Sequence, residues 1–213
     1  MRTETKEILQ ELSVRYPVLS ARQADVEACF EALKTCFETG HTLYICGNGG
    51  SASDSEHIAG ELLKSFKKCR ALPAELSENL RAYGEKGEKL LAGLEGGLPV
   101  VSLCGHLAFS TAYANDKDPA FIFAQQVNAW GRAGDVLLTI STSGNSQNCV
   151  YAAMVAKAKG MSVLGLLGNT GGELKTLADA CVVAPEKETY KVQELHLPIY
   201  HCLCAMIEAE FFG

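Results

Sequence analysis

The stretch from Leu43 to Glu61 constrains this chain more than any other. It opens with a short apolar run, 43–46, of the kind that a buried parallel strand needs. Three glycines follow within four positions, at 47, 49 and 50, and glycine lets the backbone approach a ligand closely. A helix is expected next, and its candidate N-cap side chains are Ser51, Ser53 and Asp54. A strand, a glycine turn and a helix N-terminus together predict an anion-binding site.

His57 and Glu61 follow in the same helix and are four residues apart, so they share one face. An imidazole and a carboxylate would therefore lie one to two turns beyond the anion site. The stretch is not a Walker A motif, because no Gly-Lys-Ser/Thr is present, and Ala52 stands where the dinucleotide fingerprint needs its third glycine. A glycine-rich turn without any ligand is the alternative interpretation. A basic patch comes after the helix: Lys64, Lys67, Lys68 and Arg70.

Length and composition limit the class of protein. The 213 residues suit a single domain, 1–213, with 47% hydrophobic and 21% charged residues. The net charge of −6 gives no support to nucleic-acid binding. No apolar run of about 20 residues predicts a membrane span, and the polar N-terminus does not resemble a signal peptide. The nine cysteines include no Cys-x-x-Cys pair, which favours a reduced, cytoplasmic protein.

Four further apolar runs predict strands, at 98–103, 135–140, 161–167 and 180–184. Helical patterns separate them, and this alternation predicts an α/β fold in which helices cover both faces of a five-stranded parallel sheet. Two helices are expected before the first strand. The segment at about 71–97 reads as two short helices punctuated by glycines. A break is expected around Asn115–Pro119 within a helical region, and a long last helix covers about Tyr190–Phe212.

A second polar turn, Ser141–Ser146, follows the strand at 135–140 and offers three serine hydroxyls and one threonine hydroxyl ahead of a helix. Such a turn also suits a phosphate, although a serine-rich turn is often only a capped turn. Because ligands of parallel sheets bind at the carboxyl ends of the strands, the two turns together favour a phosphorylated small molecule.

Three segments resemble a known family: Gly47–Ser51, Asp135–Ser146 and Val192–His201. They are similar to the sugar isomerase (SIS) domain, and within it to the phosphoheptose isomerase branch. The likeness covers nearly the whole chain apart from about 71–97, which reads as an insertion. We consider four roles for this insertion: a lid, a specificity wall, an oligomer contact or a surface excursion.

The resemblance implies a three-layer α/β/α sandwich, a homotetramer with sites at subunit boundaries, and an aldose-ketose isomerase. The substrate would be sedoheptulose 7-phosphate and the product D-glycero-D-manno-heptose 7-phosphate. The implied catalytic pair is Glu61 and His201. The implied sugar-phosphate contacts are Asn48, Gly49, Gly50, Ser51, Glu61, Asn115, Asp116, Ser141, Thr142, Ser143, Ser146 and Gln193. Four residues match positions that bind zinc in family members: His57, Glu61, Gln193 and His201. No organic cofactor is implied.

The residue types agree with that chemistry. Ketose-to-aldose conversion moves a proton between adjacent carbons through an enediol, which needs a base at carbon and an acid at oxygen. Glu61 can be the base, and His201, whose unperturbed pKa lies near neutrality, can be the acid. Zinc would either assist with an open coordination position or only modulate activity. The alternative function is a non-catalytic SIS protein, either a sugar-phosphate sensor or a protein of the type that binds DnaA.

Overall fold

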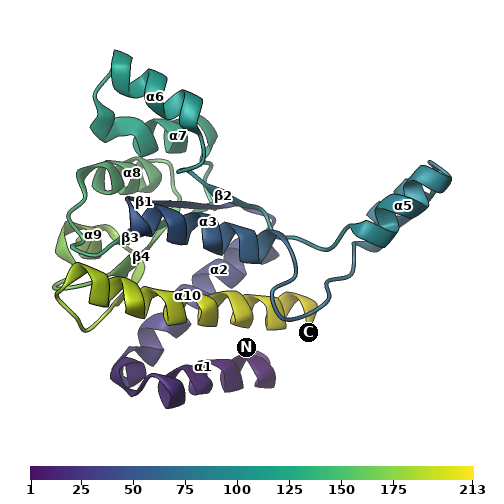
Figure 1. Ribbon diagram of the computed structural model, residues 1–213, viewed down its shortest axis with the longest axis horizontal. Coiled ribbons are helices and arrows are strands. Elements are labelled where there is room, and N and C mark those ends of the chain that lie inside the picture. Colours follow the sequence, from purple (N-terminus) through teal and green to yellow (C-terminus); the bar gives the residue numbers. More distant parts are fainter.

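Five parallel strands form the central sheet of the computed structural model, which describes residues 1–213 (Figure 1). The strands are β1 Leu43–Gly47, β2 Val100–Ser102, β3 Val136–Ser141, β4 Ser162–Leu167 and β5 Ala180–Val183. Their order in the sheet is β2-β1-β3-β4-β5, and every neighbouring pair is parallel. Because β1 lies between β2 and β3, the chain leaves the ends of these strands in diverging directions. A crevice for a ligand is expected at that point.

One face of the sheet is covered by α2 Gln23–Glu38, α3 Gly50–Leu63 and α10 Thr189–Phe212, and α1 Thr3–Arg15 packs against α10. A short 3-10 helix, η1 Pro17–Arg22, joins α1 to α2. These helices bury a cluster of 29 residues, among them the aromatic side chains of Phe30 and Tyr200. The last helix continues through Pro198. This layer carries the two helices, α3 and α10, on which the candidate acid and base are found.

The opposite face is covered by α7 Ile122–Trp130, α8 Gln147–Ala158 and α9 Gly172–Leu177, which close over a second cluster of 15 residues. The helix α6 Leu107–Asp116 and the 3-10 turn η2 Pro119–Phe121 precede α7. The predicted break around Asn115–Pro119 is thereby confirmed. The two core clusters on either side of the sheet establish the expected three-layer α/β/α sandwich.

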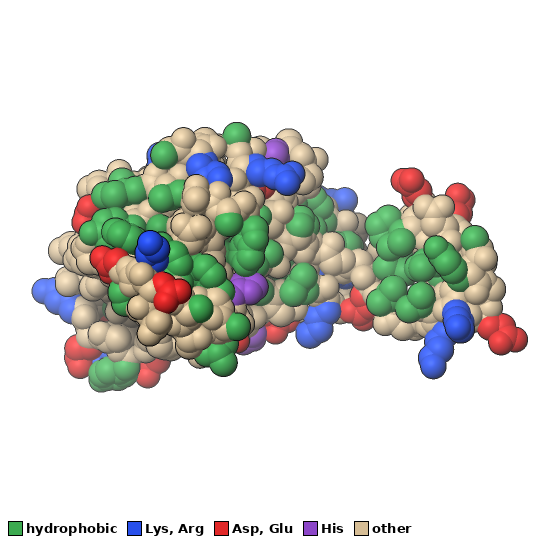
Figure 2. Space-filling model, turned by 90° about the horizontal axis from the view of Figure 1, so that it is seen from above, with side chains coloured by type: hydrophobic (Ala, Val, Ile, Leu, Met, Phe, Trp, Pro, Cys, Tyr) green, Lys and Arg blue, Asp and Glu red, His purple; other side chains and the backbone are tan.

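The segment predicted as an insertion forms a helical hairpin, α4 Ala74–Arg81 and α5 Glu85–Gly93, which extends away from the body of the molecule (Figures 1 and 2). The hairpin buries none of its side chains, and its apolar residues lie on its own surface (Figure 2). Gly87 allows the two helices to touch, because a Cβ there would lie 1.8 Å from the Leu80 carbonyl oxygen. The base of the hairpin is closed by a bond of 3.0 Å from Gly96 N–H to the Arg70 carbonyl. In this position the hairpin covers neither polar turn.

The start of α3 differs from the prediction. Gly49 is the N-cap residue, with φ 56°, and the helix begins at Gly50 without any side-chain cap. The prediction of N-caps at Ser51, Ser53 and Asp54 is therefore wrong, because the helix has already begun before any of these side chains. A residue with positive φ is needed at position 49, and glycine adopts that conformation at no steric cost.

None of the helices combines the length and the hydrophobicity that a membrane span requires. All nine cysteines are free thiols, and Cys69 is the one that is exposed. Burial raises the pKa of Cys29, Cys36 and Cys202 to about 12. The buried thiols therefore stay protonated and pack as small apolar groups.

Candidate active site

The two polar turns meet at the carboxyl ends of neighbouring strands, β1 and β3. Asn48 lies in the first turn and Asn148 in the first turn of α8, just after the second polar turn. Their side chains exchange two hydrogen bonds, from Asn48 Nδ2 to Asn148 Oδ1 at 2.9 Å and from Asn148 Nδ2 to Asn48 Oδ1 at 2.8 Å. Asn48, Gly49 and Gly50 are exposed. The arrangement places the starts of α3 and α8 beside one another, and both present a positive dipole end.

The second turn is organised by its own serines. Ser141 Oγ accepts a hydrogen bond from Gly144 N–H at 3.1 Å and lies 2.9 Å from Ser146 Oγ. Ser143 Oγ accepts from Asn145 N–H at 3.2 Å and is exposed. Ser141 is thus a buried brace of the loop, whereas Ser143 and the partly exposed Thr142 present their hydroxyls at its surface.

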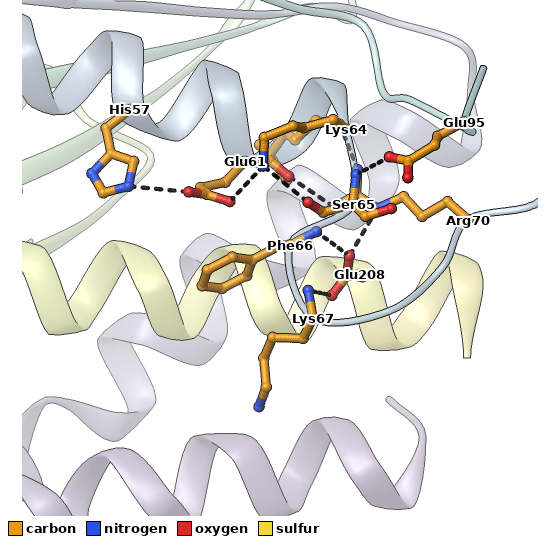
Figure 3. A network of polar contacts seen from close by, with 10 residues as sticks. His57, Glu61, Lys64, Ser65, Phe66, Lys67, Arg70, Glu95 and Glu208 are labelled. Atoms are coloured by element: carbon orange, nitrogen blue, oxygen red, sulfur yellow. Dashed lines mark hydrogen bonds and ion pairs between the residues drawn. The ribbon is translucent and has the colours of Figure 1, made fainter. Parts of the chain in front are cut away.

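His57 and Glu61 point toward one another from one face of α3 (Figure 3), with His57 Nε2 lying 3.1 Å from Glu61 Oε1. The Glu61 side chain is only 15% exposed, whereas that of His57 is 43% exposed. Lys64 Nζ lies 3.7 Å from the other carboxylate oxygen. The carboxylate is therefore sheltered from bulk water but has an open approach on the His57 side, as a general base needs.

A second contact fixes the His57 ring, and the sequence did not predict it. Tyr200 donates its hydroxyl to Asp54 Oδ1 at 3.2 Å, and His57 Nδ1 lies 3.0 Å from the same hydroxyl oxygen. The His57 ring is thereby held between the Tyr200 hydroxyl on one side and the Glu61 carboxylate on the other. Burial raises the pKa of Tyr200, and Asp54 raises it further, so the phenol stays protonated. Tyr200 belongs to an apolar stripe of α10, so no spacing in the sequence indicates its polar role.

The helix α10 brings Gln193 and His201 to this region. A Cβ on Gly50 would lie 2.6 Å from Gln193 Nε2, so the amide sits directly against the first turn. The His201 ring lies 5.1 Å from the His57 ring, centroid to centroid. His201 Nε2 is buried and has no hydrogen-bond partner. Burial lowers the pKa of His201, the charge of His57 lowers it further, and Glu61 raises it. At neutral pH the imidazole is therefore uncharged and has one ring nitrogen unsatisfied.

The predicted zinc ligands are not gathered into a metal-binding arrangement within this chain. No group of three His, Cys, Asp or Glu side chains lies so as to hold a metal ion. His57 and Glu61 form a hydrogen bond with each other, so a cation at the predicted position would have to separate them. Among the four predicted ligands, the buried His201 Nε2 is the one side-chain atom without a hydrogen-bond partner.

Asn115 and Asp116 are not brought to the two turns in this chain. They end α6, which packs on η2 and α7, and Asn115 Nδ2 donates to Asp116 Oδ1 at 2.9 Å. Neither side chain bonds a residue of either turn.

The predicted basic patch is wrong at Arg70. The Arg70 side chain is fully buried and pairs with Glu208, which is 1% exposed. The spacing of the lysines around it does not distinguish a buried arginine from an exposed one.

Comparison of the sequence with known proteins shows the family to which the chain belongs. The SIS domain matches residues 97–168. The phosphoheptose isomerase of Nitratiruptor sp. is 38% identical over 183 residues, which cover 86% of this chain and 82% of that protein. The chain belongs to the phosphoheptose isomerase family. The phosphoheptose isomerase of Leptospira biflexa is 35% identical over 207 residues, covering 97% of this chain and 94% of that one.

Solved structures of phosphoheptose isomerases agree with that assignment. The enzyme from Neisseria gonorrhoeae superposes with a TM-score of 0.72 at 29% identity, over 97% of this chain and 94% of that one. The enzyme from Francisella tularensis gives a TM-score of 0.71 at 28% identity, over 98% of this chain and 100% of that one. Both coverages span the sheet and the helices α3 and α10 that carry the candidate site.

Proposed function

We propose that this member of the phosphoheptose isomerase family converts sedoheptulose 7-phosphate to D-glycero-D-manno-heptose 7-phosphate through an enediol. The observation that supports this most directly is the grouping of a sheltered carboxylate, Glu61, with two imidazoles along α3, the helix that begins at the first of the two phosphate-type turns. A non-catalytic sensor or a DnaA-binding protein is not favoured, because the similar proteins found by comparison are named as isomerases.

In the proposed reaction, Glu61 removes the proton from carbon 1 of the ketose while His201 donates a proton to the oxygen on carbon 2. The resulting enediol then gives its oxygen-1 proton to His201, and Glu61 returns a proton to carbon 2. At the end of the reaction Glu61 and His201 have each returned to their starting protonation state. A His201 with a lowered pKa suits this shuttle, because a neutral imidazole can both donate and accept at adjacent oxygens.

The phosphate is assigned to the turns at Asn48–Ser51 and Ser141–Ser146. Two helix N-termini meet there, α3 and α8, and each directs its positive dipole end at a bound anion. The hydroxyls of Thr142 and Ser143 are the side-chain donors we assign to it, with Gln193 beside the sugar. Asn115 and Asp116 remain assigned to the substrate only from the resemblance, and a neighbouring subunit is the proposed source of that contact.

Two further parts of the proposal concern zinc and assembly. The donor types of His57, Glu61 and His201 suit zinc, and a bound cation would supply Lewis acidity at the sugar oxygens. We also propose a homotetramer of the 22.8 kDa chain, to be measured as the solution mass by light scattering.

The function is tested by proton NMR of the purified protein with sedoheptulose 7-phosphate in D₂O. We expect an anomeric aldose signal and deuterium at carbon 2 of the product. The same assay after EDTA, and again after added zinc, separates a metal-dependent reaction from one that needs only side chains. Absence of product and of exchange under all three conditions would refute the isomerase.

A further inference from the structure

Arg70 makes three hydrogen bonds while wholly excluded from solvent (Figure 3). Its Nε donates to Glu208 Oε1 at 2.9 Å, its Nη1 to the Leu62 carbonyl at 2.7 Å and its Nη2 to the Glu61 carbonyl at 2.8 Å. A buried guanidinium persists only when it is paired and hydrogen-bonded in this way. Two of the three acceptors belong to the backbone of the residue proposed as base and its neighbour.

Those two carbonyls need a partner because α3 stops directly after them. The helix ends at Leu63, and the last four carbonyls of any helix lack intrahelical donors. Glu61 therefore lies in the last turn, which is the part of a helix that frays most easily. The Leu62 carbonyl accepts from both Arg70 and Leu98 N–H, the latter at 3.0 Å, whereas the Glu61 carbonyl accepts from Arg70. Arg70 reaches the end of α3 through the loop of residues 64–70, which we call the exit loop.

Glu208 anchors both Arg70 and the exit loop. Its carboxylate also accepts from Phe66 N–H at 2.8 Å and from Lys67 N–H at 2.7 Å (Figure 3). Burial alone would raise the pKa of Glu208, but the hydrogen bonds from Phe66, Lys67 and Arg70 outweigh it and lower that pKa. The carboxylate therefore stays charged, and one residue of α10 ties down the loop that ends α3.

We propose that Arg70, held by Glu208, is a positioning residue for the base Glu61. The proposal rests on the isomerase function given above. Loss of Arg70 would leave the Leu62 carbonyl bonded to Leu98 but the Glu61 carbonyl without its donor, which would loosen the last turn of α3 and let the carboxylate move relative to His57 and the substrate. A displacement of about 1 Å can cost roughly 100-fold in rate. The phosphate-binding turns lie at the other end of α3, so substrate binding should be spared.

The test compares Arg70→Lys and Glu208→Gln with Glu210→Gln. Lysine keeps the charge of residue 70 but cannot reach all three acceptors. Glu210 is the matched control, because it is a shielded carboxylate on the same helix that bonds Thr5 Oγ1 and Lys34 rather than the exit loop. For each variant, kcat and KM are measured per folded molecule, with the folded fraction taken from circular dichroism at the assay temperature. The fraction of product carrying deuterium at carbon 2 is measured in D₂O.

We expect Glu208→Gln to lower kcat roughly 10- to 100-fold with KM within about twofold, and Arg70→Lys to lie between it and the wild type. The fraction of product carrying deuterium at carbon 2 should rise in both test variants, because a more mobile Glu61 carboxylate exchanges its proton with water more readily. A loss of folded molecules alone would leave this fraction unchanged. Glu210→Gln should match the wild type in all three quantities. Wild-type kcat per folded molecule in both test variants would overturn the positioning role. An inactive wild type would instead refute the proposed function.

Discussion

At the scale of single residues, the proposed chemistry depends on the Glu61 carboxylate, which is sheltered from solvent but not locked in a tight ion pair. Glu61 is hydrogen-bonded to His57 and lies 3.7 Å from Lys64 Nζ. It belongs to the last turn of α3, where Arg70 donates to its backbone carbonyl. Nothing in this environment binds both carboxylate oxygens tightly. The oxygen that faces His57 can therefore exchange that contact for a proton taken from substrate.

Replacing Glu61 with Gln should lower kcat by roughly 10²- to 10⁴-fold, which is the usual contribution of a general base. KM should change little, because the proposed phosphate contacts come from the two turns. Glu56→Gln is the control, since Glu56 is an exposed carboxylate on the same helix with no hydrogen bond to the site. Steady-state kinetics on both variants, with equal melting temperatures, checks the assignment. A Glu61→Gln enzyme with more than a tenth of wild-type kcat would contradict it.

At the scale of elements, the hairpin α4–α5 and the helix α10 differ in how much they contribute to the stability of the fold. The hairpin buries no side chain, whereas α10 buries more than half of its residues and bonds α1, α2, α3, β4 and the exit loop. Stability should therefore depend strongly on α10 and hardly at all on the hairpin.

Replacing residues 74–93 with a short glycine linker should shift the melting temperature by about 1–2 °C at most, the range expected for changes outside the core. The ends of the hairpin lie together, as the bond between Gly96 and Arg70 shows, so the gap can be bridged. Calorimetry measures the stability effect. KM of the same variant tests the remaining roles: an unchanged value supports a surface excursion, and a rise of tenfold or more would support a lid or specificity wall that closes on the substrate.

The elements are also where the sequence was most informative. Apolar runs and glycine breaks predicted the strands and the hairpin because these signals act within one element. Arg70 and Glu208 are 138 residues apart, and no local pattern could pair them. Tyr200 was hidden for a related reason, since its ring packs in an apolar stripe and only the tertiary contact with Asp54 reveals its hydroxyl. The glycine turn misled the N-cap prediction, because glycine at Gly49 made a side-chain cap unnecessary.

At the scale of the whole molecule, the C-terminal helix fastens the N-terminal helices to the sheet. Burial raises the pKa of Glu210, but hydrogen bonds from Arg2 N–H, Thr5 and Lys34 outweigh it and lower the pKa to about 2. The ordinary value is 4.5. Because the folded-state pKa is depressed, the stabilisation from this carboxylate is complete above about pH 4.5 and is lost as the pH falls toward 2.

Glu210→Gln should therefore cost about 2 kcal/mol at pH 7, as expected for hydrogen bonds to a charged group. For a chain of this size that cost corresponds to roughly 4–8 °C in melting temperature. The difference from wild type should shrink between about pH 4.5 and pH 2. Thermal melts of both proteins across that range measure it, and a difference that stays constant down to pH 2 would rule out the charge as its source.

The distribution of thiols has a practical consequence. Eight of the nine cysteines are at least partly shielded, and the remaining one, Cys69, lies in the exit loop next to Arg70. A maleimide dye therefore reaches Cys69 before the others without any cysteine having to be removed. Its fluorescence would report on the loop that ends α3, so movement of that loop can be followed while substrate binds.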